Sequence, residues 1–209
     1  MKKQNMLLGI AALLLGSLLL ISGCTQQKTP TPPTISIRDI LAKAQAIGPV
    51  KYDVITTSYV NGTPTITITK TVWDKSPYMK VAISLGVVPS IMIKRPDGVY
   101  VYNPVSQNYT KTNATFSEIS LEEQSHALLT NVSFIEVGNE TINGNATTII
   151  QYTTNGPGNS GTVKVWIWNE KGIPIKSEIS MVKGSTTLMT KTEYVHFVFG
   201  DIPLSEFSV

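Results

Sequence analysis

Apolar and polar residues alternate along much of the chain beyond residue 50, which is typical of half-buried β-strands. The clearest run is 78–85, where Met79, Val81, Ile83 and Leu85 share one face. This rhythm predicts strands over 52–60, 65–73, 78–85, 91–93, 99–102, 132–137, 147–153, 163–168, 175–182 and 188–199, with loops over 86–90 and 155–161. Asn-Gly pairs at 61–62 and 143–144, and Pro-Asp-Gly at 96–98, predict hairpins, so we expect antiparallel neighbours.

Two segments have helical spacing instead. Residues 37–47 carry apolar residues at helical intervals, and Ser36 precedes them as a capping residue. Residues 117–130 hold the capping-box pair Ser120 and Glu123, followed by a partial apolar stripe at Leu121, Leu128 and Leu129. The predicted fold class is therefore mainly β (α+β), with a large curved antiparallel sheet partly covered by short helices.

The first 36 residues follow a different pattern. Residues 1–23 have two lysines near the start and then an apolar run, as in a signal peptide, and the run is short for a membrane span of about 20 residues. Residues 21–24, Ile-Ser-Gly-Cys, resemble the lipobox of secreted lipoproteins, in which the cysteine is lipidated and begins the mature chain. The alternative is an uncleaved anchor with an incidental cysteine. Either interpretation places the rest of the chain outside the cytoplasm, on the membrane's extracytoplasmic face.

The predicted organisation has three parts: a signal peptide (1–23), lipidated Cys24 with a Pro/Thr-rich tether (24–36), and one domain (37–209). As the only cysteine, Cys24 cannot form an internal disulfide. Two acyl chains, at about 0.8 kcal/mol for each buried methylene, would anchor the protein firmly.

Charge and sequons add little that is specific. The chain has 17 Lys+Arg and 14 Asp+Glu, and without the two lysines of the predicted signal peptide the balance is 15 to 14, which gives no footprint for nucleic acid. Asn-x-Ser/Thr acceptors predict a glycosylated surface, although a threonine-rich β-protein with asparagine in its turns would show the same pattern. The candidates are Asn108, Asn113, Asn131, Asn139 and Asn145, with Asn61 the weakest because Pro64 follows Thr63.

Catalytic motifs are missing from the sequence. His126 and His196 are the only histidines, and neither has a neighbour at the spacing of a nucleophile–base pair or a metal site. No nucleophile elbow or phosphate-binding loop occurs. We therefore expect no enzyme activity, no cofactor and no metal, and we interpret both histidines as surface or strand residues.

Several short patterns, taken in order, resemble the LolA/LolB-type lipoprotein-carrier superfamily, including its archaeal and Gram-positive lipoprotein members. They are WDKSPYMK (73–80), DGVYVYNP (97–104), VGNETING (137–144), VWIW (165–168) with GIPIK (172–176), and the tail 199–207. The resemblance implies a half-barrel whose helices lie in its mouth and which holds acyl chains or other hydrophobic ligands without transforming them. Neither Arg38 nor Arg95, the only arginines, matches the arginine with which soluble carriers engage cargo. The lipobox instead resembles that of membrane-bound acceptors.

These observations predict a ligand cavity between the sheet and residues 117–130. Its expected walls are Ile66, Ile68, Met79, Val81, Ile83, Leu85, Trp166, Trp168, Ile179 and Met181, with Leu128 and Leu129 on the covering helix. The opposite assignment of this strand is also consistent with the sequence: Val165 and Ile167 could face the cavity instead of Trp166 and Trp168.

Two functions are consistent with the sequence. The first is a membrane-anchored lipoprotein that binds a lipid or acyl chain for lipid or lipoprotein handling or sensing, with another membrane protein as a further partner. The second is a cell-surface module with a solid core that binds proteins or glycans. A cavity of several hundred cubic ångströms under the helices would favour the first.

Overall fold

The computed structural model describes residues 35–85, 88–156 and 159–209. The predicted signal peptide, Cys24 and most of the tether lie outside the described residues, as do residues 86–87 and 157–158. Within the described residues, no helix is long and apolar enough to cross a membrane.

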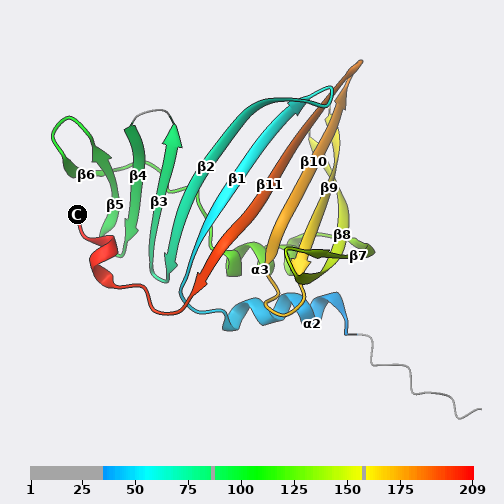
Figure 1. Ribbon diagram of the computed structural model, residues 1–209, viewed down its shortest axis with the longest axis horizontal. Helices are drawn as coiled ribbons and strands as arrows, with labels where there is room; N and C mark the ends of the chain where they lie inside the picture. Colours follow the sequence, from blue (N-terminus) through cyan, green and yellow to red (C-terminus); the bar gives the residue numbers. More distant parts are fainter. Residues whose placement is uncertain (1–34, 86–87, 157–158) are drawn as a thin grey trace, which may run out of the picture. The chain divides into compact units, whose positions relative to one another are not determined.

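One antiparallel sheet of eleven strands dominates the fold, in the order β6-β5-β4-β3-β2-β1-β11-β10-β9-β8-β7. Two meanders meet where β1 pairs with β11, at the centre of the curved, open sheet (Figure 1). The strands are β1 (Val50–Val60), β2 (Thr63–Lys75), β3 (Tyr78–Leu85), β4 (Val88–Arg95), β5 (Gly98–Asn103), β6 (Asn108–Thr112), β7 (Ile135–Ile142), β8 (Asn145–Gly156), β9 (Asn159–Trp168), β10 (Pro174–Lys183) and β11 (Thr186–Phe199).

The helices are short and lie at one end of the sheet (Figure 1). They are α2 (Ile37–Ala42), the 3-10 turn η1 (Lys43–Ala46), α3 (Leu121–Asn131) and the 3-10 turn η2 (Leu204–Phe207). Ser36 caps α2 by accepting from the Asp39 N–H, and Ser120 and Glu123 form the predicted capping box of α3. Both caps satisfy N–H groups that a helix start leaves free.

The predicted fold class is confirmed, with two local corrections. The predicted loops over 86–90 and 155–161 are both too long. Strand β4 already begins at Val88 and pairs with Leu85, and β8 runs to Gly156 while β9 begins at Asn159. Strand β6 was not predicted, since NYTKT has too few apolar residues to show alternation. It forms because β5 offers it a hydrogen-bonding partner along its whole length.

The strand register defines two faces. We call the face that carries Tyr52, Val72 and Val81 the inner face, and the opposite one the outer face. Helix α3 covers part of the inner face, where Leu121 packs with these residues in one apolar core. A second core joins Leu128 to Val163, Val165, Ile150 and the α2 residues Ile40 and Leu41.

The register corrects the expected placement of two tryptophans. Trp166 pairs with Lys176 and lies on the outer face, while Val165 pairs with Ser177 on the inner face. Trp168 lies two residues beyond Trp166 on the same strand, so its side chain also leaves the sheet on the outer face. The expectation that both tryptophans face the helices is therefore wrong. Periodicity could not decide the matter because both faces of β9 are apolar.

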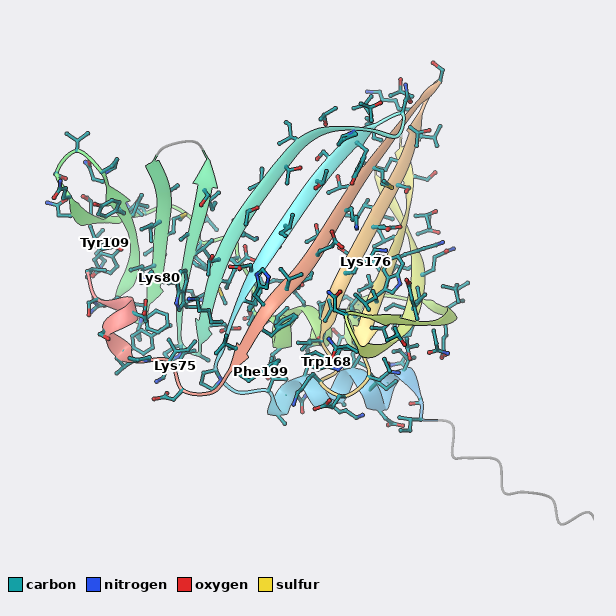
Figure 2. All side chains as sticks on the ribbon, in the orientation of Figure 1. Lys75, Lys80, Tyr109, Trp168, Lys176 and Phe199 are labelled. Carbon is teal, nitrogen blue, oxygen red and sulfur yellow. The ribbon has the colours of Figure 1, made fainter. Side chains whose placement is uncertain are left out.

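The chain's tail packs against strands β2 to β4. Phe207 of η2 and Ile202 pack against Ile93 in a third apolar core. Lys75 pairs with Asp201 at 2.6 Å, and Lys80 pairs with Glu206 at 3.0 Å. Figure 2 shows both lysines beside the C-terminal segment.

Candidate functional site

An apolar cavity of about 230 Å³ lies between α3 and the inner face. Its sheet side comes from strands β8 to β11, and its other side from α3 and the segments that flank it. The lining residues are Ile119, Gln124, Ala127, Leu128, Val132, Tyr152, Val163, Val165, Pro174, Ser177, Ile179 and Tyr194. Most are apolar, with a few hydroxyl and amide groups, which is the usual composition of a small-molecule pocket.

One hydrogen bond ties α3 to the floor of this cavity. The Tyr194 hydroxyl donates to Gln124 Oε1 at 2.8 Å. Burial, with a smaller effect from the nearby Glu118 carboxylate, raises the pKa of Tyr194 to about 12. The phenol therefore stays protonated, so it remains a donor to Gln124.

The firmest attachment of α3 is to the loop between β9 and β10. Ser125 is fully buried, and its hydroxyl contacts both Leu121 O and Gly172 O at 2.9 Å. On the other side of this loop, Gly172 approaches the backbone of Ile40 and Ala44 so closely that a Cβ would collide with it. Both helices are thus held by the same loop residue.

Beyond the helices the inner face is only partly apolar. Thr56, Ser58, Thr190 and Thr192 occupy it on the central strands β1 and β11. Two of these hydroxyls, on Thr56 and Thr192, lie 3.3 Å apart. The inner face is therefore polar at the centre of the sheet, although apolar side chains flank this hydroxyl strip on both sides.

The predicted cavity residues fall into several groups. Leu128 and Ile179 line the apolar cavity. Leu129 packs on the second core, Val81 and Ile83 on the first, and Met79 lines a separate polar pocket. Ile68 and Met181 are half-buried on the inner face beyond the helices, and Ile66 is 60% exposed there. The side chain of Leu85 lies outside the described part of the chain.

Several cavity residues were not among those predicted. Val165 was named only as the alternative to the tryptophans on β9, and Val163 on the same face was missed. Tyr152 shares its strand face with buried Ile150 at a spacing of two. That spacing was the available signal for Tyr152. Tyr194 and Ala127 gave no such signal, because only the packing of α3 onto β11 brings them to the same space.

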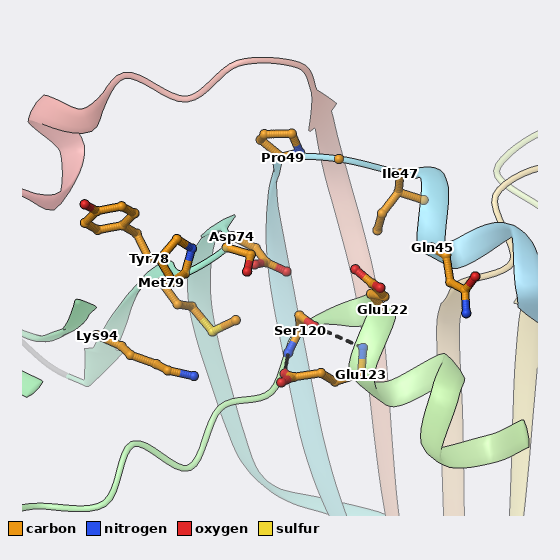
Figure 3. A pocket seen from close by; sticks show the side chains of 13 residues that line it. Gln45, Ile47, Pro49, Asp74, Tyr78, Met79, Lys94, Ser120, Glu122 and Glu123 are labelled. Carbon is orange, nitrogen blue, oxygen red and sulfur yellow. Dashed lines mark hydrogen bonds between the residues drawn. The ribbon is translucent and has the colours of Figure 1, made fainter. Parts of the chain in front are cut away.

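A second, polar pocket of about 440 Å³ opens at the start of α3, between that helix and strands β2 to β4. Asp74, Lys94, Glu122 and Glu123 face it (Figure 3). Asp74 is 7% exposed. Burial, reinforced by the Glu123 and Glu122 carboxylates, raises the pKa of Asp74 to about 6, against the opposing effect of Lys94.

The Tyr52 hydroxyl is buried beside the apolar core that contains Val72, Val81 and Leu121. Among the described residues, Tyr52 Oη is the one buried side-chain oxygen or nitrogen without a hydrogen-bond partner. Burial raises the pKa of Tyr52 far above its usual value, and the charges of Asp74 and Glu118 add to this. An unpaired buried hydroxyl costs free energy. The Tyr52 side chain is therefore stabilised by the packing of its ring against Tyr194 and Phe197, and not by its hydroxyl.

The remaining candidate residues lie on the surface. Asn108, Asn113, Asn131 and Asn139 are exposed, and Asn145 is half-buried. Asn61 uses its side chain to accept from the Thr187 N–H at 2.8 Å. In the described ranges, no three His, Cys, Asp or Glu side chains come together as metal ligands.

The sequence matches no family model, and no curated protein matches it. The fold is similar to that of MucB in the MucA/MucB complex of Pseudomonas aeruginosa, with a TM-score of 0.52 and 12% identity, over 83% of this chain and 60% of that one. Other matches include a LolA superfamily protein from Nitrosomonas europaea (TM-score 0.42, 13% identity, 84% of this chain and 98% of that one). The lipoprotein LppX from Mycobacterium tuberculosis also matches (TM-score 0.41, 16% identity, 75% and 91%). At these identities the likeness concerns the fold alone.

Proposed function

We propose that this protein is an extracytoplasmic lipoprotein, anchored through lipid on Cys24, that binds a hydrophobic ligand between α3 and the inner face of the sheet. The ligand is a lipid or an acyl chain, which the protein holds and releases without chemical conversion. The lipobox pattern at residues 21–24 supports the anchor. The observation that supports the ligand is the apolar cavity under α3.

The route into the cavity supports an elongated ligand. Ile179 borders the cavity, and Met181 follows it on the same face of β10 at a spacing of two. Met181 pairs with Leu188 of β11, so apolar side chains continue from the cavity toward the far end of the sheet. An acyl chain that lies partly inside the cavity and partly along this row would cover both the cavity lining and the apolar row.

The attachment of α3 supports a movable cover. Ser125 fixes the helix to Gly172, and within the described residues two hydrogen bonds tie α3 to strand side chains, one from Tyr194 to Gln124 and one from the Leu121 N–H to the Asp74 carboxylate. Besides the packing of Leu121 and Leu128 on the two cores, few hydrogen bonds to the sheet would have to break for α3 to open locally. Movement of α3 away from β10 would enlarge the cavity without breaking its attachment to the loop.

The second candidate is a protein-binding module with a nearly solid core. The observation that favours it is the cavity's volume, about 230 Å³, which is below the usual range for ligand pockets of roughly 300–1,000 Å³. The MucB structure, which is similar in fold, was solved together with the protein MucA. Ligand binding therefore has to be measured directly.

The test uses residues 35–209, which contain all three apolar cores, and the fluorescent fatty acid cis-parinaric acid. Wild type should bind the probe, and Ala127→Phe should weaken binding at least about tenfold, because the ring fills the space that the chain needs. His126→Phe is the matched control, since it adds the same ring to the exposed side of α3. If wild type binds no probe, or if both variants bind like wild type, the hydrophobic-ligand function is wrong.

A further inference from the structure

A second hollow, of about 570 Å³, lies where β10 and β11 separate at the lower end of the sheet. The two strands pair only as far as Lys176 and Glu193, whereas β11 continues to Phe199. Side chains from β9 and β11 fill the space between the strands. Figure 2 shows Trp168 and Phe199 together at this end.

Aromatic rings form the apolar part of the hollow. Phe197 and Phe199 stack with centroids 5.8 Å apart and planes at 8°. Trp168 lies across them, 6.0 Å from Phe197 and 5.9 Å from Phe199. The three rings hold one another in place, so they present a rigid apolar surface at little cost in side-chain entropy.

The polar part of the hollow includes an oriented imidazole. His196 is 76% exposed, and its Nδ1 lies 2.8 Å from Asp53 Oδ2. The other oxygen of Asp53 accepts from the Thr71 hydroxyl at 2.6 Å, which fixes the carboxylate. With Nδ1 engaged by Asp53, Nε2 is the ring nitrogen that is left to bind a ligand.

The backbone at His196 is strained to hold this arrangement. His196 has φ +55°, at the irregularity where the β1–β11 register shifts between Lys51 and Asp53. Non-glycine residues in this conformation cost free energy and cluster at functional sites. An extra residue in one strand re-aims a side chain, and here it brings the imidazole to the hollow.

The chemistry of the lining identifies the class of ligand. Besides His196 and the Tyr194 phenol, the polar lining residues are Asn143 and Asn145 from the β7–β8 hairpin, and none of the described lining residues carries a carboxylate or an amino group. The nearest ammonium that contacts the rings is that of Lys171, whose Nζ lies 5.9 Å from the Trp168 centroid and 5.3 Å from the Phe199 centroid. Neutral amides and an imidazole suit a ligand with many hydroxyl groups and no charge. An aromatic floor suits a ring with one face of C–H groups. We propose that this hollow binds a saccharide ring, with its C–H face on Trp168 and its hydroxyls on His196 and the two asparagines.

This site is independent of the proposed hydrophobic-ligand site, although Tyr194 borders both. The test therefore changes residues that line the hollow alone. His196→Asn removes the imidazole and keeps the backbone, because asparagine tolerates positive φ. Asn145→Ala removes one amide at the start of β8. His126→Asn, on the exposed side of α3, is the matched control.

The full chain, made without N-glycans and reconstituted in phosphatidylcholine vesicles, is titrated with the methyl glycosides of glucose, galactose, mannose and N-acetylglucosamine at millimolar concentration. Saturation-transfer NMR should show at least one glycoside receiving magnetisation from aromatic protons at its ring C–H groups. His196→Asn and Asn145→Ala should each weaken that binding about three- to tenfold, as expected for one lost hydrogen bond. The control should bind like wild type, and binding of cis-parinaric acid by residues 35–209 should not change in His196→Asn.

The saccharide site is refuted if none of the four glycosides receives magnetisation from the wild-type protein. It is equally refuted if a glycoside binds with the same affinity to both hollow variants and to wild type. Circular dichroism and the melting temperature show whether each variant is folded. Should one variant unfold, the other still decides the result, because the two residues lie on different strands.

Discussion

Replacement of Asp74 by asparagine should stabilise the protein at neutral pH. Asp74 is a buried carboxylate beside the start of α3, where Glu122 and Glu123 add negative charge. Asparagine has nearly the same shape and no charge, so the substitution removes the cost of the buried charge and leaves the packing in place.

The magnitude and the pH window follow from the pKa. The folded-state pKa of Asp74 is about 6, against 3.8 for an ordinary aspartate. Between these values the folded protein binds more protons than the unfolded chain, so stability falls as the pH rises. At about 1.4 kcal/mol for each pH unit, the loss above pH 6 amounts to about 3 kcal/mol.

Urea unfolding of residues 35–209, followed by tryptophan fluorescence at several pH values between 4 and 7, measures this difference. The free energy of unfolding of Asp74→Asn should be close to that of wild type near pH 4 and about 3 kcal/mol higher at pH 7. Glu136→Gln is the control, because Glu136 is exposed on β7, and its curve should run parallel to that of wild type. A variant less stable than wild type at pH 7 would refute the reasoning, since it would mean that the start of α3 stabilises the Asp74 charge.

The other predictions concern the anchor, a loop and a hairpin. Gly172→Ala should lower the free energy of unfolding by at least about 2 kcal/mol, because φ is +73° and the new Cβ would lie 2.9 Å from Ala44 N; an unchanged urea midpoint would contradict this. Gly144→Val should destabilise by more than about 1 kcal/mol, because φ is +82° in a hairpin turn, and a melting temperature equal to that of wild type would count against it. Cys24→Ser should release the protein from membranes or leave an uncleaved precursor, and fractionation showing a processed, membrane-bound variant would exclude the lipoprotein anchor.

Local sequence determined most of the secondary structure. Alternation at 78–85 gave β3 with the bounds that the structure shows, and the Ser120–Glu123 capping box marked the start of α3. The Asn143-Gly144 pair has positive φ at both residues, as a two-residue hairpin requires. These features depend on neighbours within a few residues, so a single sequence contains the information.

Tertiary structure decided which side chains lie on each face of the sheet. Both faces of β9 are apolar, and only its pairing with β8 and β10 turns Val165 inward and Trp166 outward. The hollow beside His196 likewise needs the separation of β10 from β11, which no local pattern encodes.

The cavity and the raised pKa of Asp74 have the same origin. Both depend on where α3 lies against strands that are distant in the sequence. The position of α3 is set in turn by the contact of Ser125 with Gly172, 47 residues away. Periodicity tells which side chains share a face of one element, but long-range packing decides which faces meet, how much space remains between them, and which charges are taken out of water.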